Sequence, residues 1–313
     1  MSMSKQKIVI TGASGFVGKD FVKMLDLDKY EISVITRKKE KLVNLFDSSV
    51  KIVEADLMNI DSLKSAFEGQ EVLINLAAEV RNHDLLEKTN VLGTKNCLEA
   101  IKLTGIKKAI HLSSVGVVGK PFSNSSIKIT EDVDPTPQNE YERTKNISEQ
   151  LFTEASKSNS FELVVLRPTN VFGEHHPFNA LLNLMQTIEN GKPLIYTKGA
   201  MVNYVYVSDV SASIVSALEN QTKNGIYNVG YAMELNDFYT IIMKSMNKKT
   251  RKYKVPSILT SFVDKLGIKK LQTISNRLEY SDVRLRENFT YPVGVEKGIE
   301  NTVEYYKKQG LLK

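Results

Sequence analysis

Short apolar runs alternate with longer amphipathic runs in the first half of the chain. The short runs are rich in Val, Ile and Leu, as expected for strands that are covered on both faces. In the longer runs the apolar residues recur with helical spacing. The pattern predicts strands at Lys7–Thr11, Glu31–Thr36, Lys51–Glu54, Val72–Leu76, Ala109–Ser113 and Glu162–Leu166. It predicts helices at Phe16–Leu27, Ile60–Phe67, Leu85–Leu103 and Tyr141–Lys157.

This alternation favours an α/β fold built on a doubly wound parallel sheet, with a ligand at the carboxyl ends of the strands. After Leu166 the pattern is less regular, and the basic C-terminal remainder is expected to be helical. We therefore expect one unit over residues 1–166, with return segments near 204–232, and a smaller one over most of 167–313. The later elements expected are helices at Phe178–Asn190, Asp209–Leu218 and Val295–Lys308 and strands at Tyr204–Val207 and Gly225–Val229.

Composition narrows the class of protein. The 313 residues are 42% hydrophobic and 25% charged, which is typical of globular proteins. The single cysteine, Cys97, excludes an internal disulfide, and the chain shows no signal peptide and no run of about 18 apolar residues, so we expect a cytoplasmic protein. The net charge of +6 is modest. We interpret the basic run 248–254 as a solvated surface loop, with an anionic partner as the alternative, and expect neither nucleic acid nor membrane as a partner.

A glycine-rich turn follows the first predicted strand directly. Gly12, Gly15 and Gly18 are spaced three residues apart, and a helical pattern comes next. Gly12 permits a tight turn, Gly15 lets the backbone approach a pyrophosphate, and Gly18 lets the helix lie close to the sheet. Because N–H groups at a helix start bind phosphate oxygens, the turn indicates a dinucleotide site rather than a plain strand–helix connection. The residues expected to contact the dinucleotide here are Gly12, Ser14, Gly15, Phe16, Val17 and Gly18.

The end of the second strand distinguishes the two nicotinamide cofactors. A carboxylate there would bind the ribose hydroxyls, whereas a guanidinium would accommodate a 2′-phosphate. Arg37 occupies that position within Thr36-Arg37-Lys38-Lys39, so we favour NADP, with NAD as the alternative. Asp56 follows the third strand and is expected to contact the adenine amino group. Further cofactor contacts are expected from Leu57, Leu76, Ala77 and Ala78.

A hydroxyl, a phenol and an ammonium group form the candidate catalytic set. Tyr141 and Lys145 lie four residues apart, on one face of the predicted helix. A tyrosine normally titrates near 10, and a neighbouring ammonium and a cationic nicotinamide would both lower its pKa. Ser114 ends the fifth strand, where its hydroxyl can bind a carbonyl or alcohol oxygen of a substrate. The glycine turn, the strand-end serine and the Tyr–Lys pair occur in this order along the chain.

With these motifs the chain resembles the extended short-chain dehydrogenase/reductase family of nucleotide-sugar epimerases, dehydratases and reductases. The resemblance covers about Lys7 to Gly230 and returns weakly near 296–310. It implies a Rossmann-type sheet with a smaller C-terminal substrate-binding domain. In that family Tyr141 would be the proton donor or base, Lys145 would modulate its pKa and bind the ribose, and Ser114 would orient the substrate oxygen.

The resemblance also assigns roles to residues outside the catalytic set. Pro168 and Val171 would border the nicotinamide, and Asn170 would lie near the substrate. Asn90 matches a structural asparagine of the central helix, and Asp209 would cap a helix. A homodimer through the helices at Leu85–Leu103 and Tyr141–Lys157 is also implied.

Two departures from the family limit the functional prediction. Val115 and Gly116 follow Ser114, so no acidic pair is present and a dehydratase is disfavoured. No arginine precedes the strand at Tyr204–Val207, so a diphosphate clamp would come from elsewhere or the substrate lacks a diphosphate. The candidates for such a clamp are Arg277, Arg284 and Arg286. His175 is a candidate substrate contact, and no metal site is predicted because His175 and His176 have no third ligand nearby in the sequence.

These observations favour an NADP- or NAD-dependent oxidoreductase that transfers hydride to or from a carbonyl or alcohol carbon. The expected substrate is sugar-like, with a nucleotide sugar among the possibilities, or another small molecule. One alternative is a nucleotide-sugar epimerase that retains tightly bound NAD. An alternative of another class is a non-catalytic dinucleotide-binding sensor or scaffold.

Overall fold

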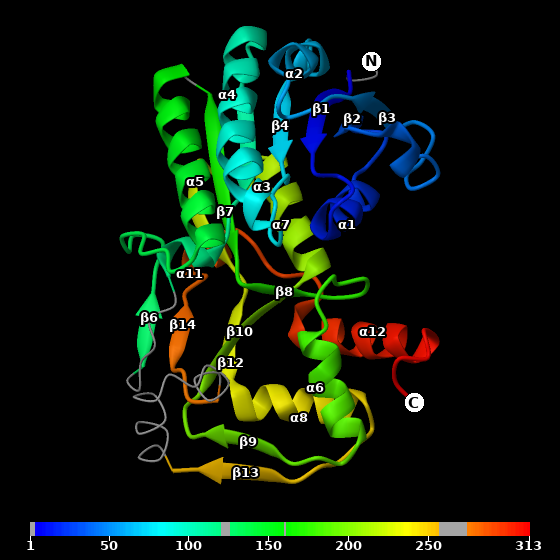
Figure 1. The fold of residues 1–313 in the computed structure, drawn as a ribbon, viewed down its shortest axis with the longest axis vertical. Helices are drawn as coiled ribbons and strands as arrows, with labels where there is room; N and C mark the ends of the chain where they lie inside the picture. Colours follow the sequence, from blue (N-terminus) through cyan, green and yellow to red (C-terminus); the bar gives the residue numbers. More distant parts are fainter. Residues whose placement is uncertain (1–3, 120–125, 160, 257–273) are drawn as a thin grey trace.

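The computed structural model describes residues 4–119, 126–159, 161–256 and 274–313 (Figure 1). Within these ranges the largest sheet has seven strands in the order β11-β7-β5-β4-β1-β2-β3, and every pairing is parallel. The predicted α/β class is confirmed. The strands of this sheet are β1 (Gln6–Thr11), β2 (Tyr30–Thr36), β3 (Lys51–Glu54), β4 (Val72–Asn75), β5 (Lys108–Leu112), β7 (Glu162–Pro168) and β11 (Gly225–Val229).

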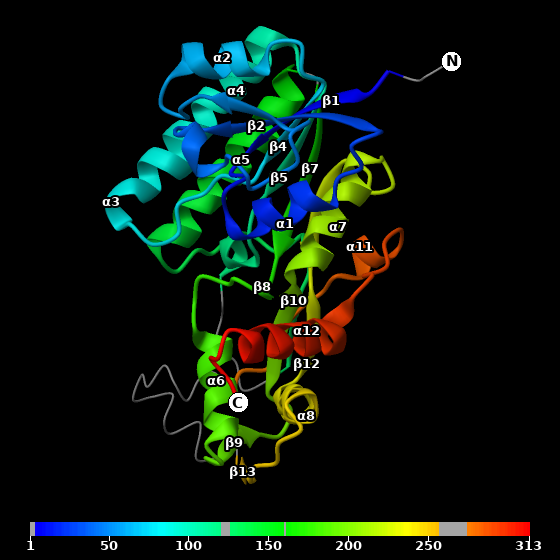
Figure 2. The ribbon, with the colours of Figure 1, turned by 90° about the vertical axis from the view of Figure 1, so that its right-hand side faces the viewer.

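Helices cover both faces of this sheet (Figure 2). One face carries α1 (Phe16–Met24) and α7 (Val207–Leu218), whose Phe21 and Ile214 pack with the strands in a shared core. The other face carries α2 (Ile60–Phe67), α4 (Gly93–Thr104) and α5 (Glu140–Asn159), with Phe67 and Phe152 in the core. Burial on both faces explains why the middle residues of a strand, such as Ile8–Ile10 of β1, are consecutively apolar instead of alternating.

The helix predicted over Leu85–Leu103 is interrupted. It begins as α3 (His83–Leu86), continues as a π-helical segment η2 (Glu87–Leu92), and only then becomes α4. Such π segments are often found at functional sites. Asn90, which lies within this one, is buried.

The smaller part of the molecule lies beyond the carboxyl ends of the strands (Figure 1). Its core brings together Met185, Phe238 and Ile299 from three helices. The helices of this part are α6 (Ala180–Glu189), α8 (Leu235–Ser245) and α12 (Gly294–Lys308). The short helix α11 (Val283–Arg286) contacts β11 instead, and its Leu285 belongs to the core of the large sheet. Its small sheets pair β8 (Asn170–Phe172), β10 (Met201–Tyr206) and β12 (Tyr231–Glu234); β9 (Leu194–Thr197) and β13 (Lys252–Val255); and β6 (Ile127–Ile129) and β14 (Leu278–Tyr280).

The return segments near 204–232 are divided between the two parts. β11 joins the large sheet beside β7, and α7 packs on α1, whereas β10 pairs with β8 and β12. β7 continues to Pro168, past the proposed boundary at residue 166. The division into domains remains a proposal.

Several expectations for the second half are wrong. Asp209 does not cap its own helix, because α7 begins at Val207 and the Asp209 carboxylate instead accepts hydrogen bonds from the backbone N–H groups of Val293 and Gly294 at the start of α12, each 2.9 Å long. Part of the basic run 248–254 is strand β13, which pairs with β9, and not loop. Strands β12 to β14 also lie where mainly helix was expected. Residues 257–273 of that stretch lie outside the described residues.

Candidate active site

A cavity of about 560 Å³ opens at the carboxyl ends of β1, β2 and β4. β1 is the central strand from which the chain proceeds to β2 and β3 on one side and to β4 on the other. A crevice at this change of direction is the expected ligand position in a doubly wound sheet. Nine of the residues predicted to bind the cofactor line the cavity: Gly12, Ser14, Gly15, Arg37, Asp56, Leu57, Leu76, Ala77 and Ala78.

The glycine turn makes close backbone contacts. Gly12 has φ +74°, and a Cβ there would lie 2.6 Å from the backbone N of Ala77. A Cβ on Gly18 would lie 2.3 Å from the Gly12 oxygen, so α1 approaches the turn as the sequence predicts. Gly15 is the N-cap of α1, with no side-chain cap and no acidic residue in the first turn. The backbone N–H groups at the start of α1 are therefore suited to bind a phosphate, and the site fits a dinucleotide.

Basic side chains gather at one end of the cavity. Lys38 and Lys41 line it together with Arg37, and Lys88 lines it from the π segment. Lys41 and Lys88 were not predicted, because no local motif indicates that these turns fold back over the crevice. The other cavity residues that sequence reasoning did not assign to the cofactor are Thr11, Ile35, Thr36, Lys38, Ala55, Met58, Glu79, Leu85 and Thr89. The remaining predicted cofactor residues, Phe16, Val17, Gly18, Lys145, Pro168 and Val171, do not line this cavity in the described chain.

The catalytic set comes together at the end of β5 and the start of α5. Lys145 is 2% exposed, and its Nζ donates a 2.8 Å hydrogen bond to the Leu112 carbonyl. Burial lowers the pKa of Lys145 to about 8, and the negative charge of Glu149 partly offsets that effect. Ser114 Oγ accepts a 3.0 Å hydrogen bond from Gly116 N–H and interacts with the Tyr141 hydroxyl.

The expected lowering of the Tyr141 pKa is not found in the protein alone. Burial raises the pKa of Tyr141, a hydrogen bond from Ser114 lowers it, and the charge of Glu142 raises it further. The ammonium of Lys145 donates its hydrogen bond to the Leu112 carbonyl, and within the protein alone burial outweighs the lowering of the Tyr141 pKa by Ser114. Tyr141 is therefore protonated at neutral pH and suited to donate a proton.

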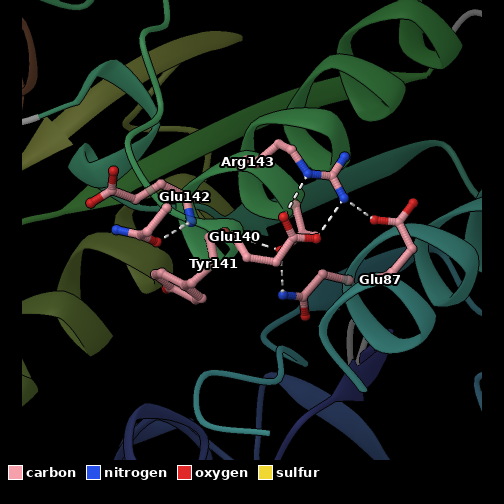
Figure 3. A network of polar contacts seen from close by, with 8 residues as sticks. Glu87, Glu140, Tyr141, Glu142 and Arg143 are labelled. Carbon is pink, nitrogen blue, oxygen red and sulfur yellow. Dashed lines mark hydrogen bonds and ion pairs between the residues drawn. The ribbon is translucent and has the colours of Figure 1, made fainter. Parts of the chain in front are cut away.

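Ion pairs fix the start of α5 (Figure 3). The Arg143 guanidinium donates to both oxygens of Glu140, at 2.9 and 2.6 Å, and to Glu87 of the π segment. The Glu142 backbone N–H donates a 3.0 Å hydrogen bond to Asn139 Oδ1. Since Tyr141 lies between Glu140 and Glu142, these contacts hold the helical turn that carries the phenol.

The predicted substrate residues lie in the segment that follows β7. Asn170 is exposed, and its Nδ2 donates a 2.8 Å hydrogen bond to the Asn203 carbonyl. His175 is also exposed, and its Nδ1 lies 2.8 Å from the Tyr305 hydroxyl of α12. It is His176 that packs against the glycine turn, with its ring 4.8 Å from that of Phe16.

The arginines considered as a diphosphate clamp have partners inside the protein. Arg284 forms an ion pair with Asp132 at 2.6 Å, and Arg286 pairs with Asp282 at 3.0 Å. Arg277 donates a 3.0 Å hydrogen bond to the Lys198 carbonyl. In the described part of the chain, no group of three His, Cys, Asp or Glu side chains is placed to hold a metal ion.

Residues 8–230 match the model of the NAD dependent epimerase/dehydratase family. This chain belongs to that family. The resemblance, the Rossmann-type fold and the prediction of an NAD(P)-dependent enzyme that acts by hydride transfer are thereby confirmed.

Relatives with curated names include epimerases and reductases. The chain is 26% identical over 325 residues to N-acetyl-alpha-D-glucosaminyl-diphospho-ditrans,octacis-undecaprenol 4-epimerase of Escherichia coli O157:H7, covering 95% of this chain and 94% of that protein. It is 25% identical over 343 aligned positions to anthocyanidin reductase of Arabidopsis thaliana, covering 98% of this chain and 96% of that protein.

Solved structures share the fold. The structure of UDP-N-acetylglucosamine 4-epimerase from Methanobrevibacter ruminantium, in complex with UDP-N-acetylmuramic acid, has a TM-score of 0.75 at 23% identity and covers 98% of this chain and 100% of that chain. UDP-glucose 4-epimerase of Thermus thermophilus, in complex with NAD, has a TM-score of 0.72 at 22% identity and covers 96% of this chain and 99% of that chain. Among the described residues, no helix has both the length and the apolar character needed to cross a membrane.

Proposed function

We propose that this protein reduces a carbonyl, or oxidises the corresponding alcohol, on a nucleotide-linked or otherwise activated sugar, and that NADP is its preferred cofactor. The observation that carries the proposal is that Tyr141, Lys145 and Ser114 meet at the end of β5, the strand next to β4, whose following residues Leu76, Ala77 and Ala78 line the cavity. The names of the relatives support a sugar substrate, because two of them are 4-epimerases of activated N-acetylglucosamine.

In the reducing direction Ser114 and Tyr141 hold the substrate oxygen. A bound nicotinamide dinucleotide would supply the hydride that the carbonyl carbon takes up. Tyr141 is protonated because burial raises its pKa, so it donates its proton to the oxygen as the new alcohol forms. The ammonium of Lys145 then stabilises the phenolate. In the oxidising direction the same groups act in reverse order.

The preference for NADP rests on Arg37, Lys38 and Lys41, which line the cavity beyond β2 where a carboxylate would favour NAD. We would titrate the protein with NADPH and with NADH and follow nicotinamide fluorescence. Arg37→Ala should weaken NADPH binding about tenfold or more and leave NADH binding nearly unchanged, since it removes a charged hydrogen bond to the phosphate. Lys39→Ala is the matched control, because Lys39 belongs to the same basic turn but does not line the cavity. Equal affinities that Arg37→Ala leaves unaffected would remove the NADP preference.

A second candidate is an epimerase that retains NAD, which the named epimerases among the relatives favour. An epimerase oxidises and then reduces the same substrate, so its reaction shows no net change in nicotinamide absorbance. NAD that co-purifies, together with interconversion of sugar epimers without added cofactor, would place this candidate first. A non-catalytic sensor would bind the dinucleotide, and Tyr141→Phe would not change its cellular role.

We also propose a cytoplasmic location and a homodimer through Leu85–Leu103, which includes η2 and most of α4, and through Tyr141–Lys157 of α5. Leu92 and Leu103 are 47% and 51% exposed, where apolar side chains would be covered by a second copy. Light scattering should give the mass of two chains, and Leu103→Glu should shift it to one. A monomeric mass for the unaltered protein would exclude the dimer.

A further inference from the structure

A closed ring of hydrogen-bonded polar groups, most of them buried, lies behind the residues that line the cavity. Thr11 Oγ1 lies 2.5 Å from Asn75 Oδ1, and Asn75 Nδ2 lies 3.1 Å from His111 Nδ1. His111 Nε2 lies 3.4 Å from Ser148 Oγ, which lies 2.7 Å from Thr94 Oγ1. Thr94 Oγ1 in turn lies 2.7 Å from the Asn90 carbonyl.

The ring closes through the segment that follows β4. Asn90 Oδ1 accepts a 2.8 Å hydrogen bond from Glu79 N–H, and Asn90 Nδ2 donates a 3.0 Å bond to the Glu79 carbonyl. Ala77 N–H donates to Thr11 Oγ1 at 3.3 Å. Leu76, Ala77 and Ala78, which line the cavity, are therefore held at both ends by the same set of groups.

The chemistry of these groups fixes the direction of every bond. A carbonyl oxygen only accepts, so Thr94 donates to Asn90, and Ser148 must then donate to Thr94. The Ser148 oxygen consequently accepts from His111 Nε2–H, and His111 Nδ1 accepts from Asn75 Nδ2–H. Thr11 then donates to Asn75 Oδ1. Protonation of His111 at Nδ1 would place two donors against each other and break the ring.

We propose that neutral His111, with its proton on Nε2, is a positioning residue that links the cofactor-binding segment Leu76–Glu79 to the catalytic helix α5. It acts on α5 through Ser148, one turn beyond Lys145. It acts on the cofactor side through Asn75 and Thr11, the residue that precedes Gly12. The next residue of β5 after His111 is Leu112, whose carbonyl accepts the hydrogen bond from Lys145.

The surroundings of His111 agree with this role. His111 is 0% exposed and stacks on Phe152, with ring centroids 4.5 Å apart. Burial first and the charge of Lys145 second lower the pKa of His111 well below its usual range. Lys145 is the charged side chain that acts on His111 from the elements packed around it. The other neighbouring side chains, Asn75, Ser148 and Thr94, are neutral.

The tautomer can be measured directly. The chain has four histidines, so nitrogen-labelled histidine gives few resonances, and His111→Phe assigns the one of interest. Long-range proton–nitrogen correlation should show a protonated Nε2 and a bare Nδ1 that do not change between about pH 5 and pH 8. A proton on Nδ1, or titration within this range, would overturn the proposal.

Cofactor affinity tests the link itself. His111→Phe keeps an aromatic ring against Phe152 but removes both hydrogen bonds, so NADH and NADPH should each bind about tenfold more weakly. His111→Gln can accept from Asn75 and donate to Ser148, and should return the affinity to within about threefold of the unaltered protein. If His111→Phe does not fold, Ser148→Ala replaces it in the experiment, because it breaks the same ring with a smaller change of side chain. Thr302→Val, which removes a buried hydroxyl of α12, should lower stability without changing affinity.

Unchanged cofactor affinity in a folded His111→Phe protein would reduce His111 to a packing residue and reject the link. The proposal rests on the proposed dinucleotide site, yet the two fail differently. An unaltered protein that binds neither NADH nor NADPH contradicts the proposed function. The tautomer of His111 is measured without either cofactor, so its outcome stands apart from that result.

Discussion

The guanidinium of Arg167 on β7 forms a two-point ion pair with the carboxylate of Glu149 on α5, one bond being 3.0 Å from Nε to Oε2. Both side chains are buried, at 3% and 5% exposure. Arg167 also donates a 3.2 Å hydrogen bond to the Glu131 carbonyl. The pair joins α5, which carries the candidate catalytic residues Tyr141 and Lys145, to β7, which ends at Pro168.

Arg167→Met should destabilise the fold by about 3–5 kcal/mol, because it leaves the Glu149 charge buried without a partner. The double variant Arg167→Met, Glu149→Leu should recover most of that loss, since no unpaired charge remains. Urea unfolding of the three proteins measures the difference. A double variant as unstable as the single one would show that the loss comes from packing and not from the unpaired charge.

Lys145→Met should abolish hydride transfer and yet raise the free energy of unfolding by about 1–3 kcal/mol at pH 7. The folded protein releases the Lys145 proton near pH 8, whereas the unfolded chain holds it to about 10.5. The unfolded state therefore binds more protons between these values, and the burial cost of the charge should disappear as pH rises through that window. Activity should decline above about pH 8 for the same reason.

Lys108→Met is the matched control for that prediction. Burial also lowers the pKa of Lys108, which donates to Ala217 and Asn220 away from the cavity. Its replacement should leave activity unchanged. A Lys145→Met protein that is less stable than the unaltered protein would contradict the expected cost of burying the Lys145 charge.

Gly12→Ala should block cofactor binding, because its Cβ would lie 2.6 Å from the Ala77 nitrogen, in the wall of the cavity. Gly69→Ala isolates the backbone effect, since Gly69 has φ +70° against +74° for Gly12 but has no atom within 4 Å of its Cβ. Gly69→Ala should cost only about 1 kcal/mol and leave binding intact. Calorimetry with NADPH and thermal unfolding of both variants would measure the two effects. Normal NADPH affinity in Gly12→Ala would show that the close contact between Gly12 and Ala77 does not shape the site.

Asp209→Asn should destabilise the protein by about 1–2 kcal/mol and loosen α12, because the carboxylate of α7 supplies the cap that α12 lacks. Hydrogen exchange of the amides in residues 294–308 measures this effect. Glu296→Gln, in the first turn of α12 itself, is the control and should have a smaller effect. Equal effects of the two variants would reduce the role of Asp209 to its charge near the helix start.

The repeating pattern of strands and helices in the sequence was sufficient to predict the sheet and the glycine turn. Covered parallel strands such as β4 contain consecutive apolar residues, here Val72–Ile74, and Gly12, Gly15 and Gly18 are spaced as a strand–turn–helix connection requires. The Tyr141–Lys145 spacing follows from the helical repeat alone. These features are local, so a window of the sequence contains all the information that produces them.

Other features depend on residues distant in the sequence. Nothing near Asp209 indicates that it caps α12, and nothing near Lys41 indicates that its turn returns to the cavity. The ring through His111 joins groups from β1, β4, β5, α4 and α5, whose contacts exist only once the layers pack. The Tyr141 pKa also depends on the tertiary structure, because burial, which the sequence does not state, raises this pKa more than the hydrogen bond with Ser114 lowers it. Local spacing thus determined most elements of the first half and suggested the candidate catalytic set, whereas packing of both layers on the sheet decided which charges are buried and which groups are hydrogen-bonded.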